Sequence, residues 1–170
     1  VSEINNPACS VFPSYGRAWA QVSNTPFRKY KCRSYEGGIS TPLIVSWKSN
    51  LKNKKGEWCR VPGYLPDIMP TILEATGAAY PETYHAIKGK VSSIHEYMYW
   101  EHQNNRAIRW GNWKAIRDEK GKEWELYDVV KDRTERNNLA EQHPEVLTKL
   151  VAEWEKWANS NFVLPKHPKK

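Results

Sequence analysis

The chain has 170 residues, with 26 Lys and Arg against 19 Asp and Glu, and a formal net charge of +7. The excess positive charge lies in residues 1–66, which hold ten basic and three acidic side chains and no Asp, whereas residues 67–170 hold sixteen of each sign. Nine Trp and nine Tyr exclude a wholly disordered chain, because disordered segments are poor in aromatic residues. No apolar run approaches the roughly 20 residues that a membrane-spanning helix needs. Three Cys without zinc-type spacing predict neither a disulfide framework nor a zinc site.

Residues 1–47 are expected to contain few regular elements. Turn-forming residues predict a loop over residues 1–16. Thr25 as N-cap and Pro26 at the first helical position predict one or two helical turns, which end at Gly37-Gly38. The unbroken apolar run Pro42–Trp47 predicts a strand that is buried on both faces.

A short helix is predicted in the middle of the chain. Asp67 is expected to cap a helix over residues 68–76 that ends at Gly77. The apolar stripe that would be buried consists of Ile68, Ile72 and Leu73. Residues 78–93 are expected to form a connector.

From residue 94 the pattern favours a small antiparallel sheet covered by a helix. The expected strands are Glu96–His102, Arg106–Trp110, Trp113–Arg117 and Glu123–Val129. Gly111-Asn112 fits a two-residue hairpin loop. The clearest helix of the chain is Pro144–Asn159, whose apolar stripe is Leu147, Leu150, Val151, Trp154 and Trp157. This stripe predicts core packing against one face of the sheet, an α+β arrangement.

The sequence contains no self-sufficient catalytic motif. There is no G-x-S-x-G, no Walker loop, no G-x-G-x-x-G and no H-E-x-x-H. The five His residues are scattered, and such His residues are more often structural or exposed than catalytic.

Five stretches in order nevertheless resemble motifs of the sulfatase family. These are Ser23–Pro42 with its E-G-G, Asp67–Leu73 as D-I-M-P-T-I-L, Trp100–Arg109 as W-E-H-x-x-N-R-A-I-R, Gly111–Lys114 as G-N-W-K, and Glu125–Ala140 as E-L-Y-D…D-x-x-E-x-x-N-L-A. Any one of them is a weak signal. Together they span about residues 15–158, and the chain is identified by resemblance as the C-terminal region of a type I, arylsulfatase-like sulfatase of the alkaline-phosphatase-like superfamily.

The resemblance implies the fold class and a division of the chain. The fold is expected to be an α/β sulfatase fragment. Residues 1–93 would be the end of the large α/β domain, and residues 94–164 an α+β subdomain with a four-stranded antiparallel sheet and a packed C-terminal helix. Residues 165–170 would be a basic tail.

The resemblance also implies a sulfate-ester hydrolase. In this family a formylglycine nucleophile attacks sulfur, Ca²⁺ polarises the sulfate, and Lys and His residues bind it. One catalytic position carries over, Lys31, which matches the sulfate-contacting Lys before E-G-G. A fixed cation aimed at the oxygens of the transition state would stabilise it. The expected substrate is a sulfated small molecule or a sulfated carbohydrate, and the family suggests a periplasmic, secreted or lysosomal location.

The nucleophile and the metal site are not expected from this chain. No Cys or Ser stands in C/S-x-P/A-x-R, and residues 1–66 contain no Asp that could supply the family's metal ligands. Asn5 and Asn6 are neutral, and such ligands cannot by themselves hold a hard divalent cation. We therefore expect a missing N-terminal sulfatase portion as the partner of this chain, and no activity from the chain alone.

Other polar residues are weaker candidates. Glu101 and His102 could face the substrate or form a cross-strand pair on the sheet surface. Arg106 could bind a substrate anion or form a salt bridge with Glu101. Glu36 is expected to cap or brace the Gly37-Gly38 turn and not to act as a base.

Two other function classes are compatible with the residues. The first is a non-catalytic domain that binds carbohydrate or a protein partner. The second is single-stranded nucleic-acid binding through the basic loop near Lys48, with Trp47 and Trp58 as a stacking platform. The basic residues lie in one loop and no nucleic-acid module is present, so we expect no nucleic-acid partner.

Overall fold

The computed structural model describes residues 16–50, 56, 58–78, 95–119, 121 and 123–164. The predicted N-terminal loop, the connector over residues 78–93 and the basic tail lie almost entirely outside these residues. Among the helices of the described part, none is long and apolar enough to cross a membrane.

The four predicted strands form one antiparallel sheet in chain order. They are β1 (Tyr97–His102), β2 (Asn105–Trp110), β3 (Trp113–Arg117) and β4 (Glu125–Asp128). Gly111-Asn112 joins β2 to β3 as expected, with Trp110 opposite Trp113 and Gly111 at a φ of 55°. Gln103 and Asn104, with φ of 50° and 68°, form the loop between β1 and β2. Two positive φ angles are typical of the hairpin turn whose twist matches that of the strands.

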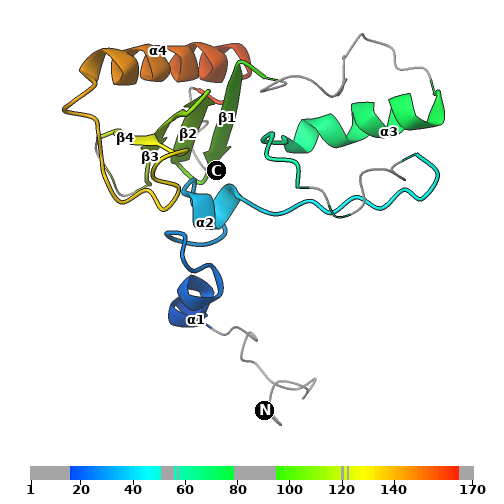
Figure 1. Cartoon of the computed structure of the whole chain (residues 1–170). Helices are drawn as coiled ribbons and strands as arrows, with labels where there is room; N and C mark the ends of the chain where they lie inside the picture. The colour runs from blue at the N-terminus through cyan, green and yellow to red at the C-terminus, as the bar shows by residue number, and fades with distance from the viewer. Residues whose placement is uncertain are drawn as a thin grey trace, which may run out of the picture.

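Helix α4 (Pro144–Ser160) covers one face of the sheet and confirms the predicted C-terminal helix (Figure 1). Its buried residues Leu150, Trp154 and Ala158 pack on Ile108, Ala115 and Leu126 of the sheet. Leu147 and Trp157 pack at the edge of this cluster. Burial of apolar surface between these two layers is the main stabilising contribution to this unit.

The opposite face of the sheet is covered by the segment that precedes residue 40. Tyr35 packs with Ala107, Ile116, Tyr127 and Val129 in a second buried cluster. Figure 1 shows α2 (Glu36–Ile39) on the side of the sheet away from α4. Residues near 35 and residues 95–164 therefore share a core, although the predicted boundary at residue 93 lies between them.

The helical turns expected after Thr25 lie before it. Helix α1 spans Gly16–Ser23, and the Thr25 hydroxyl donates to the Val22 carbonyl at its C-terminal end, at 2.8 Å. The prediction was wrong because a Thr hydroxyl can also satisfy a carbonyl at a helix end. Gly37-Gly38 does not end a helical segment either, since both residues lie inside the single turn of α2.

Pro42–Trp47 does not form the expected buried strand. The segment has no regular structure, and Leu43, Ile44 and Val45 are 72%, 89% and 62% exposed. A strand needs a hydrogen-bonded neighbour, and no described residue pairs with this segment.

The middle helix has the predicted bounds but not the predicted burial. Helix α3 runs from Ile68 to Thr76 and ends at Gly77, whose φ is 71°. Ile68 and Ile72 are exposed. The Asp67 carboxylate does not cap α3. It accepts from the backbone N–H of Tyr64 at 2.9 Å and lies 2.6 Å from His95 Nε2, which links the 3₁₀ turn Leu65–Asp67 to the start of the sheet region.

Candidate functional site

The candidate site is built around the Lys31 turn, defined here as residues 24–35. Lys31 is exposed, and no described residue forms a hydrogen bond or ion pair with its ammonium group. Its neighbours Lys29 and Cys32 have φ of 65° and 73°. This left-handed conformation costs about 1–2 kcal/mol for a residue with a side chain. The turn therefore has a specific shape that other contacts must hold.

Two glycines provide the close backbone contact that shapes the turn. A Cβ on Gly38 would lie 2.0 Å from the Arg33 carbonyl oxygen, and a Cβ on Gly37 would lie 2.4 Å from the Arg28 carbonyl oxygen. The Gly37 N–H donates to that same Arg28 oxygen at 3.1 Å. Only glycine permits this close approach, so the two glycines of E-G-G let the backbone of the Lys31 turn pack directly against α2.

Arg28 attaches the turn to the sheet. Its guanidinium donates to the Tyr127 hydroxyl at 3.0 Å and to the backbone carbonyl of Glu135, and it lies 4.7 Å from the centre of the Tyr35 ring. The hydroxyls of Tyr35 and Tyr127 both donate to Glu125 Oε2, each at 2.7 Å. Burial and the Glu125 carboxylate raise the pKa of both phenols well above their ordinary value.

Arg33 attaches the turn to the sheet at a second place, at the start of β2 and just after the end of β3. Its guanidinium donates to Asn105 Oδ1 at 3.1 Å and also contacts the carboxylates of Asp118 and Glu119, at 3.3 and 3.1 Å. Arg28 and Arg33 thus bind the sheet on the two sides of Lys31 in sequence. The ammonium of Lys31 is left facing solvent.

An ion cluster joins α2 to the sheet, and we call its members Lys114, Glu36, Glu135 and Arg133 the Lys114 cluster. Three of them are buried, and Arg133 is exposed. The Lys114 side chain is fully buried, and its Nζ donates to Glu36 Oε1 at 2.8 Å and to Glu135 Oε1 at 2.7 Å. Glu135 Oε2 accepts from the Glu36 backbone N–H at 2.8 Å. Arg133 Nε lies 3.4 Å from Glu36 Oε2. The expectation that Glu36 braces its turn is confirmed, and the brace is an ion cluster.

The two carboxylates of the cluster differ in pKa. Burial pushes the pKa of Glu36 upward, but the charges of Lys114 and Arg133 outweigh it and hold the pKa below its usual value. Burial dominates at Glu135 and raises its pKa despite the nearby Lys114. On acidification Glu135 is therefore the first of the two to take up a proton, and the titration belongs to the cluster as a whole.

The weaker site candidates separate onto the two faces of the sheet. Glu101 lies opposite Arg106 in the β1–β2 register, and the Arg106 guanidinium stacks on Trp154 of α4, at 4.8 Å from the ring centre. Exposed His102 lies opposite Asn105, the residue that binds Arg33, so it belongs to the face that carries the Lys31 turn. The structure brings Glu101 and Arg106 together and places them on the face away from Lys31. Their roles, and that of Lys31, stay predictions.

Three of the sequence motifs meet in the Lys114 cluster. Glu36 comes from E-G-G, Lys114 from G-N-W-K, and Glu135 from D-x-x-E-x-x-N-L-A. Sequence reasoning noted each motif but did not pair them. One local feature could have indicated the buried ion pair. Lys114 is the fourth residue of G-N-W-K and lies inside an expected strand, where a side chain can face the core.

The described residues do not fit the Ca²⁺ site that the resemblance implies. They contain no group of three or more His, Cys, Asp and Glu that could hold a metal ion. Ca²⁺ takes six to eight oxygen ligands, several of them carboxylates. We therefore assign no step of the chemistry to a metal held by these residues.

Comparison with known proteins identifies the relatives of this chain. No model of a known protein family matches the sequence. An uncharacterized sulfatase of Schizosaccharomyces pombe is 35% identical over 162 residues, which cover 82% of this chain and 28% of that protein. The N-acetylgalactosamine-6-O-sulfatase of Bacteroides thetaiotaomicron is 29% identical over 147 residues, which cover 73% of this chain and 28% of that protein. A solved structure from work on glycosaminoglycan metabolism by Bacteroides thetaiotaomicron is 27% identical, with a TM-score of 0.44, and the match covers 55% of this chain and 24% of that one.

These relatives are much longer than the matched part. The chain spans about 28% of the length of the two curated proteins.

Proposed function

We propose that this chain, the C-terminal region of a sulfatase, supplies the cation Lys31 to a site that hydrolyses sulfate esters. The sulfated substrate would be a small molecule or a carbohydrate. The observation that carries the proposal is the exposed Lys31 ammonium on a turn held from both sides by Arg28 and Arg33.

The role of Lys31 follows from the charge of the reacting group. Negative charge on the sulfate oxygens and on the leaving oxygen is stabilised by a cation that is already in position before the reaction. The strained backbone at Lys29 and Cys32 and the attachment of Arg28 and Arg33 limit the movement of the turn. Lys31 would bind the sulfate and stabilise the charge that develops when the alcohol leaves.

The nucleophile and the metal would come from the other part of the enzyme. No Cys or Ser of this chain stands in the sequence that becomes formylglycine in this family, and the described residues hold no candidate metal cluster. The proposal therefore includes an N-terminal sulfatase portion as the partner of this chain. The chain alone would have no hydrolase activity.

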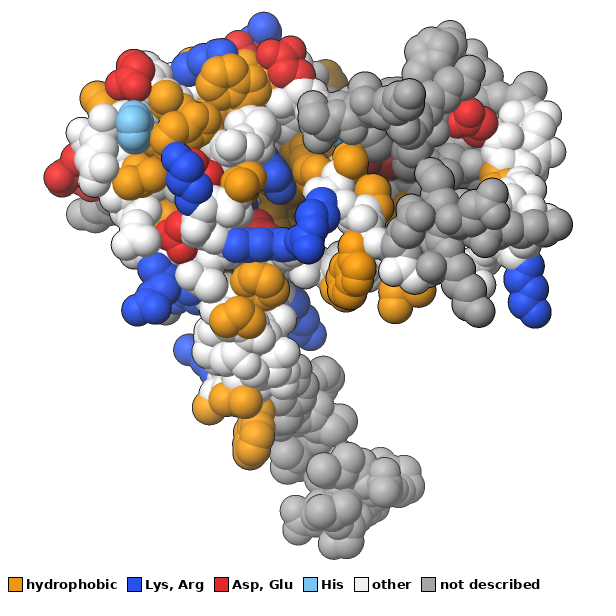
Figure 2. Space-filling view, viewed as in Figure 1, with side chains coloured by type: hydrophobic (Ala, Val, Ile, Leu, Met, Phe, Trp, Pro, Cys, Tyr) orange, Lys and Arg blue, Asp and Glu red, His pale blue; other side chains and the backbone are white. Residues whose placement is uncertain are grey.

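The exposed apolar segment Pro42–Trp47 supports such a partner. Figure 2 shows hydrophobic side chains exposed on the connection that leads from α2 toward α3. An extended segment with exposed apolar side chains and unpaired backbone groups is a template for pairing with another strand. We propose that this segment adds a strand to a sheet of the N-terminal portion.

The test is a Lys31→Ala substitution in the full-length enzyme that contains this chain, with its formylglycine formed and an aryl sulfate as substrate. We expect kcat to fall by about 10²–10³-fold, because one preorganised charge contact to the transition state is lost. The melting temperature should stay unchanged, since Lys31 is exposed and has no partner among the described residues.

The matched control is Lys156→Ala, which removes an exposed ammonium from α4 and should leave kcat unchanged. Unaltered turnover in Lys31→Ala would contradict the assignment of Lys31. Hydrolysis of the aryl sulfate by the isolated 170-residue chain would contradict the proposal that the nucleophile lies elsewhere.

A further inference from the structure

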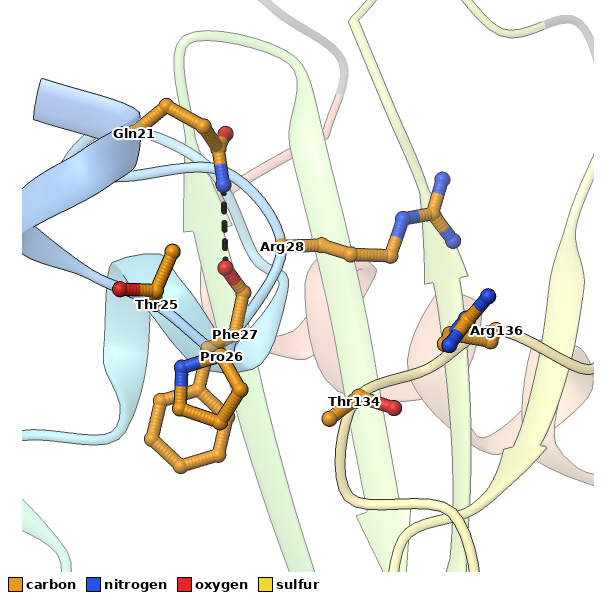
Figure 3. Close-up of a pocket in the computed structure, with 7 residues that line it drawn as sticks. All are labelled: Gln21, Thr25, Pro26, Phe27, Arg28, Thr134 and Arg136. Atoms are coloured by element: carbon orange, nitrogen blue, oxygen red, sulfur yellow. Dashed lines mark hydrogen bonds between the residues drawn. The ribbon is translucent and has the colours of Figure 1, made fainter. Parts of the chain in front are cut away.

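A cavity of about 480 Å³ opens beside the Lys31 turn (Figure 3). One wall comes from the end of α1 and the start of the turn, and the other from the loop after β4. The lining residues are Gln21, Thr25, Pro26, Phe27, Arg28, Thr134 and Arg136. The cavity is open to solvent, and its volume is large enough to hold a sulfate-sized group.

Two guanidinium groups reach this cavity from the two walls. Figure 3 shows the Arg28 side chain extending from the turn toward the loop that carries Arg136. None of the seven lining residues has a carboxylate. Two cations on one cavity without a facing anion create a positive potential there.

The carboxylates near the cavity belong to Glu125, Asp132 and Glu135, and each is hydrogen-bonded to other groups. Glu125 Oε2 accepts from the hydroxyls of Tyr35 and Tyr127. Asp132 Oδ2 accepts from the backbone N–H groups of Arg136 and Asn137, each at 2.7 Å, and its Oδ1 accepts from the Thr134 hydroxyl. The Glu135 carboxylate is buried on Lys114. The loop thus turns its acidic groups inward or onto its own backbone and leaves Arg136 at the cavity.

Arg136 has unused donors. Its side chain is exposed, and no described residue forms a hydrogen bond or ion pair with its guanidinium. Arg28 uses one terminal nitrogen for Tyr127 and Glu135, which fixes its position. A planar guanidinium with free N–H groups is suited to bind a sulfate, carboxylate or phosphate group in two-point contact.

We propose that this cavity binds an oxyanion group through Arg136 and Arg28. The first source of that group is a second sulfate or a carboxylate on the substrate whose ester is hydrolysed at Lys31, and this part rests on the proposed function. Lys31 follows Arg28 by three positions in the sequence, so their Cα atoms lie at most about 11 Å apart. The second source is a free inorganic anion.

The binding test uses the full chain and inorganic sulfate at constant ionic strength. Sodium sulfate replaces sodium chloride while the side-chain N–H signals of the arginines are followed by nuclear magnetic resonance. Wild-type chain should show saturable shifts, and Arg136→Gln should weaken the binding at least about tenfold, as expected for loss of a charged hydrogen-bond donor. Lys131→Gln, which removes an exposed charge from the same loop region, should bind sulfate as the wild type does.

Arg136 is the residue to change because Arg28 also holds the turn on the sheet, so that its replacement could unfold the site. Equal sulfate affinity in Arg136→Gln and wild type, or the absence of saturable binding in wild type, would overturn the proposal. Neither outcome depends on turnover, so a failure here is separate from a failure of the Lys31 assignment.

The source of the anion is distinguished in the full-length enzyme. Arg136→Gln should raise KM for a substrate with two sulfate groups and leave the kinetics on a singly sulfated aryl ester unchanged if the group belongs to the substrate. Loss of sulfate binding with no change in KM for either substrate assigns the cavity to a free anion. An equal fall in kcat on both substrates would overturn the proposal, because it would place Arg136 in the reaction itself.

Discussion

At the scale of single residues, Lys114 is a charged side chain that the fold buries completely. Its ammonium is fully buried between two carboxylates that are 78 and 21 residues away in sequence. Charges of this kind cost several kcal/mol to desolvate, and the cost is recovered only when every partner is in place. The cluster is therefore an all-or-none connection between α2, β3 and the loop after β4.

We expect Lys114→Met to destabilise the chain by about 3–5 kcal/mol, because it leaves the buried Glu135 carboxylate without its cation and Glu36 with Arg133 alone. Urea unfolding followed by tryptophan fluorescence measures the change. The second variant combines Lys114→Met with Glu135→Gln, which removes the carboxylate of raised pKa. The double variant should recover part of the loss, and equal stability of Lys114→Met and wild type would contradict the role of the cluster.

The carboxylates of Glu36 and Glu135 make the stability of the fold depend on pH in opposite directions. The lowered pKa of Glu36 gives stability that is present above its unfolded pKa and is lost as the pH falls. The raised pKa of Glu135 means that the folded chain holds that proton to a higher pH than the unfolded chain, so this residue contributes stability that is lost as the pH rises. The two effects partly cancel in the acid range.

At the scale of elements, the short helix α2 and the Lys31 turn form one packed unit. Gly37 and Gly38 admit the backbone of residues 28–33 at distances that no side chain would allow. The glycines of E-G-G are thus explained by this close packing. We expect the position of Lys31 to depend on this contact, because residues 28–33 include Lys31.

Gly38→Ala is expected to displace the turn, since its Cβ would meet the Arg33 carbonyl oxygen at 2.0 Å. Overpacking of this kind costs about 1–3 kcal/mol. Hydrogen exchange should become faster at the Gly37 amide, which donates to the Arg28 carbonyl. Gly63→Ala is the matched control, because a Cβ there meets nothing within 4 Å. Unchanged exchange at Gly37 in Gly38→Ala would refute the packing role of the glycine pair.

At the scale of the whole molecule, contacts cross the predicted boundary at residue 93. The turn and α2 are bound to the sheet by Arg28, Arg33, Tyr35 and the Lys114 cluster, whereas Pro42–Trp47 is exposed. The chain enters the sheet unit and leaves it through this exposed segment. It contacts the sheet region again at Tyr64, whose hydroxyl donates to the Tyr99 carbonyl, before it forms β1. A cut in the segment should therefore leave both sides of the unit attached to each other.

Limited chymotrypsin digestion tests this arrangement. We expect early cleavage within Pro42–Trp47, whose apolar side chains are exposed, and resistance within β1–β4 and α4. The fragment that carries the Lys31 turn should co-elute with the fragment that carries the sheet on size exclusion, identified by mass spectrometry. The same digestion of Lys114→Met should release it. Separate elution of the two wild-type fragments would contradict the shared core.

The sequence by itself determined the helices and strands that depend only on residues close together in the chain. Apolar alternation and turn residues were enough to predict the four strands, and the apolar stripe was enough to predict α4. In both cases a few neighbouring residues show which face of the element is buried. The ordered motifs were also enough to recognise a sulfatase region. The expected strand at Pro42–Trp47 was wrong for the described chain because an apolar run does not state whether a neighbouring strand is present.

Only the tertiary structure decided which distant residues meet. No local pattern pairs Glu36 with Lys114 and Glu135, because an ion pair between sequence-distant groups depends on the route of the chain. The same holds for the separation of Lys31 from Glu101 and Arg106 by the sheet, and for the cavity shared by Arg28 and Arg136. The excess positive charge of residues 1–66 was evident from composition. The fold decided that Arg28 and Arg33 hold the turn while Lys31 stays exposed, because only partners across the sheet distinguish one cation from the next.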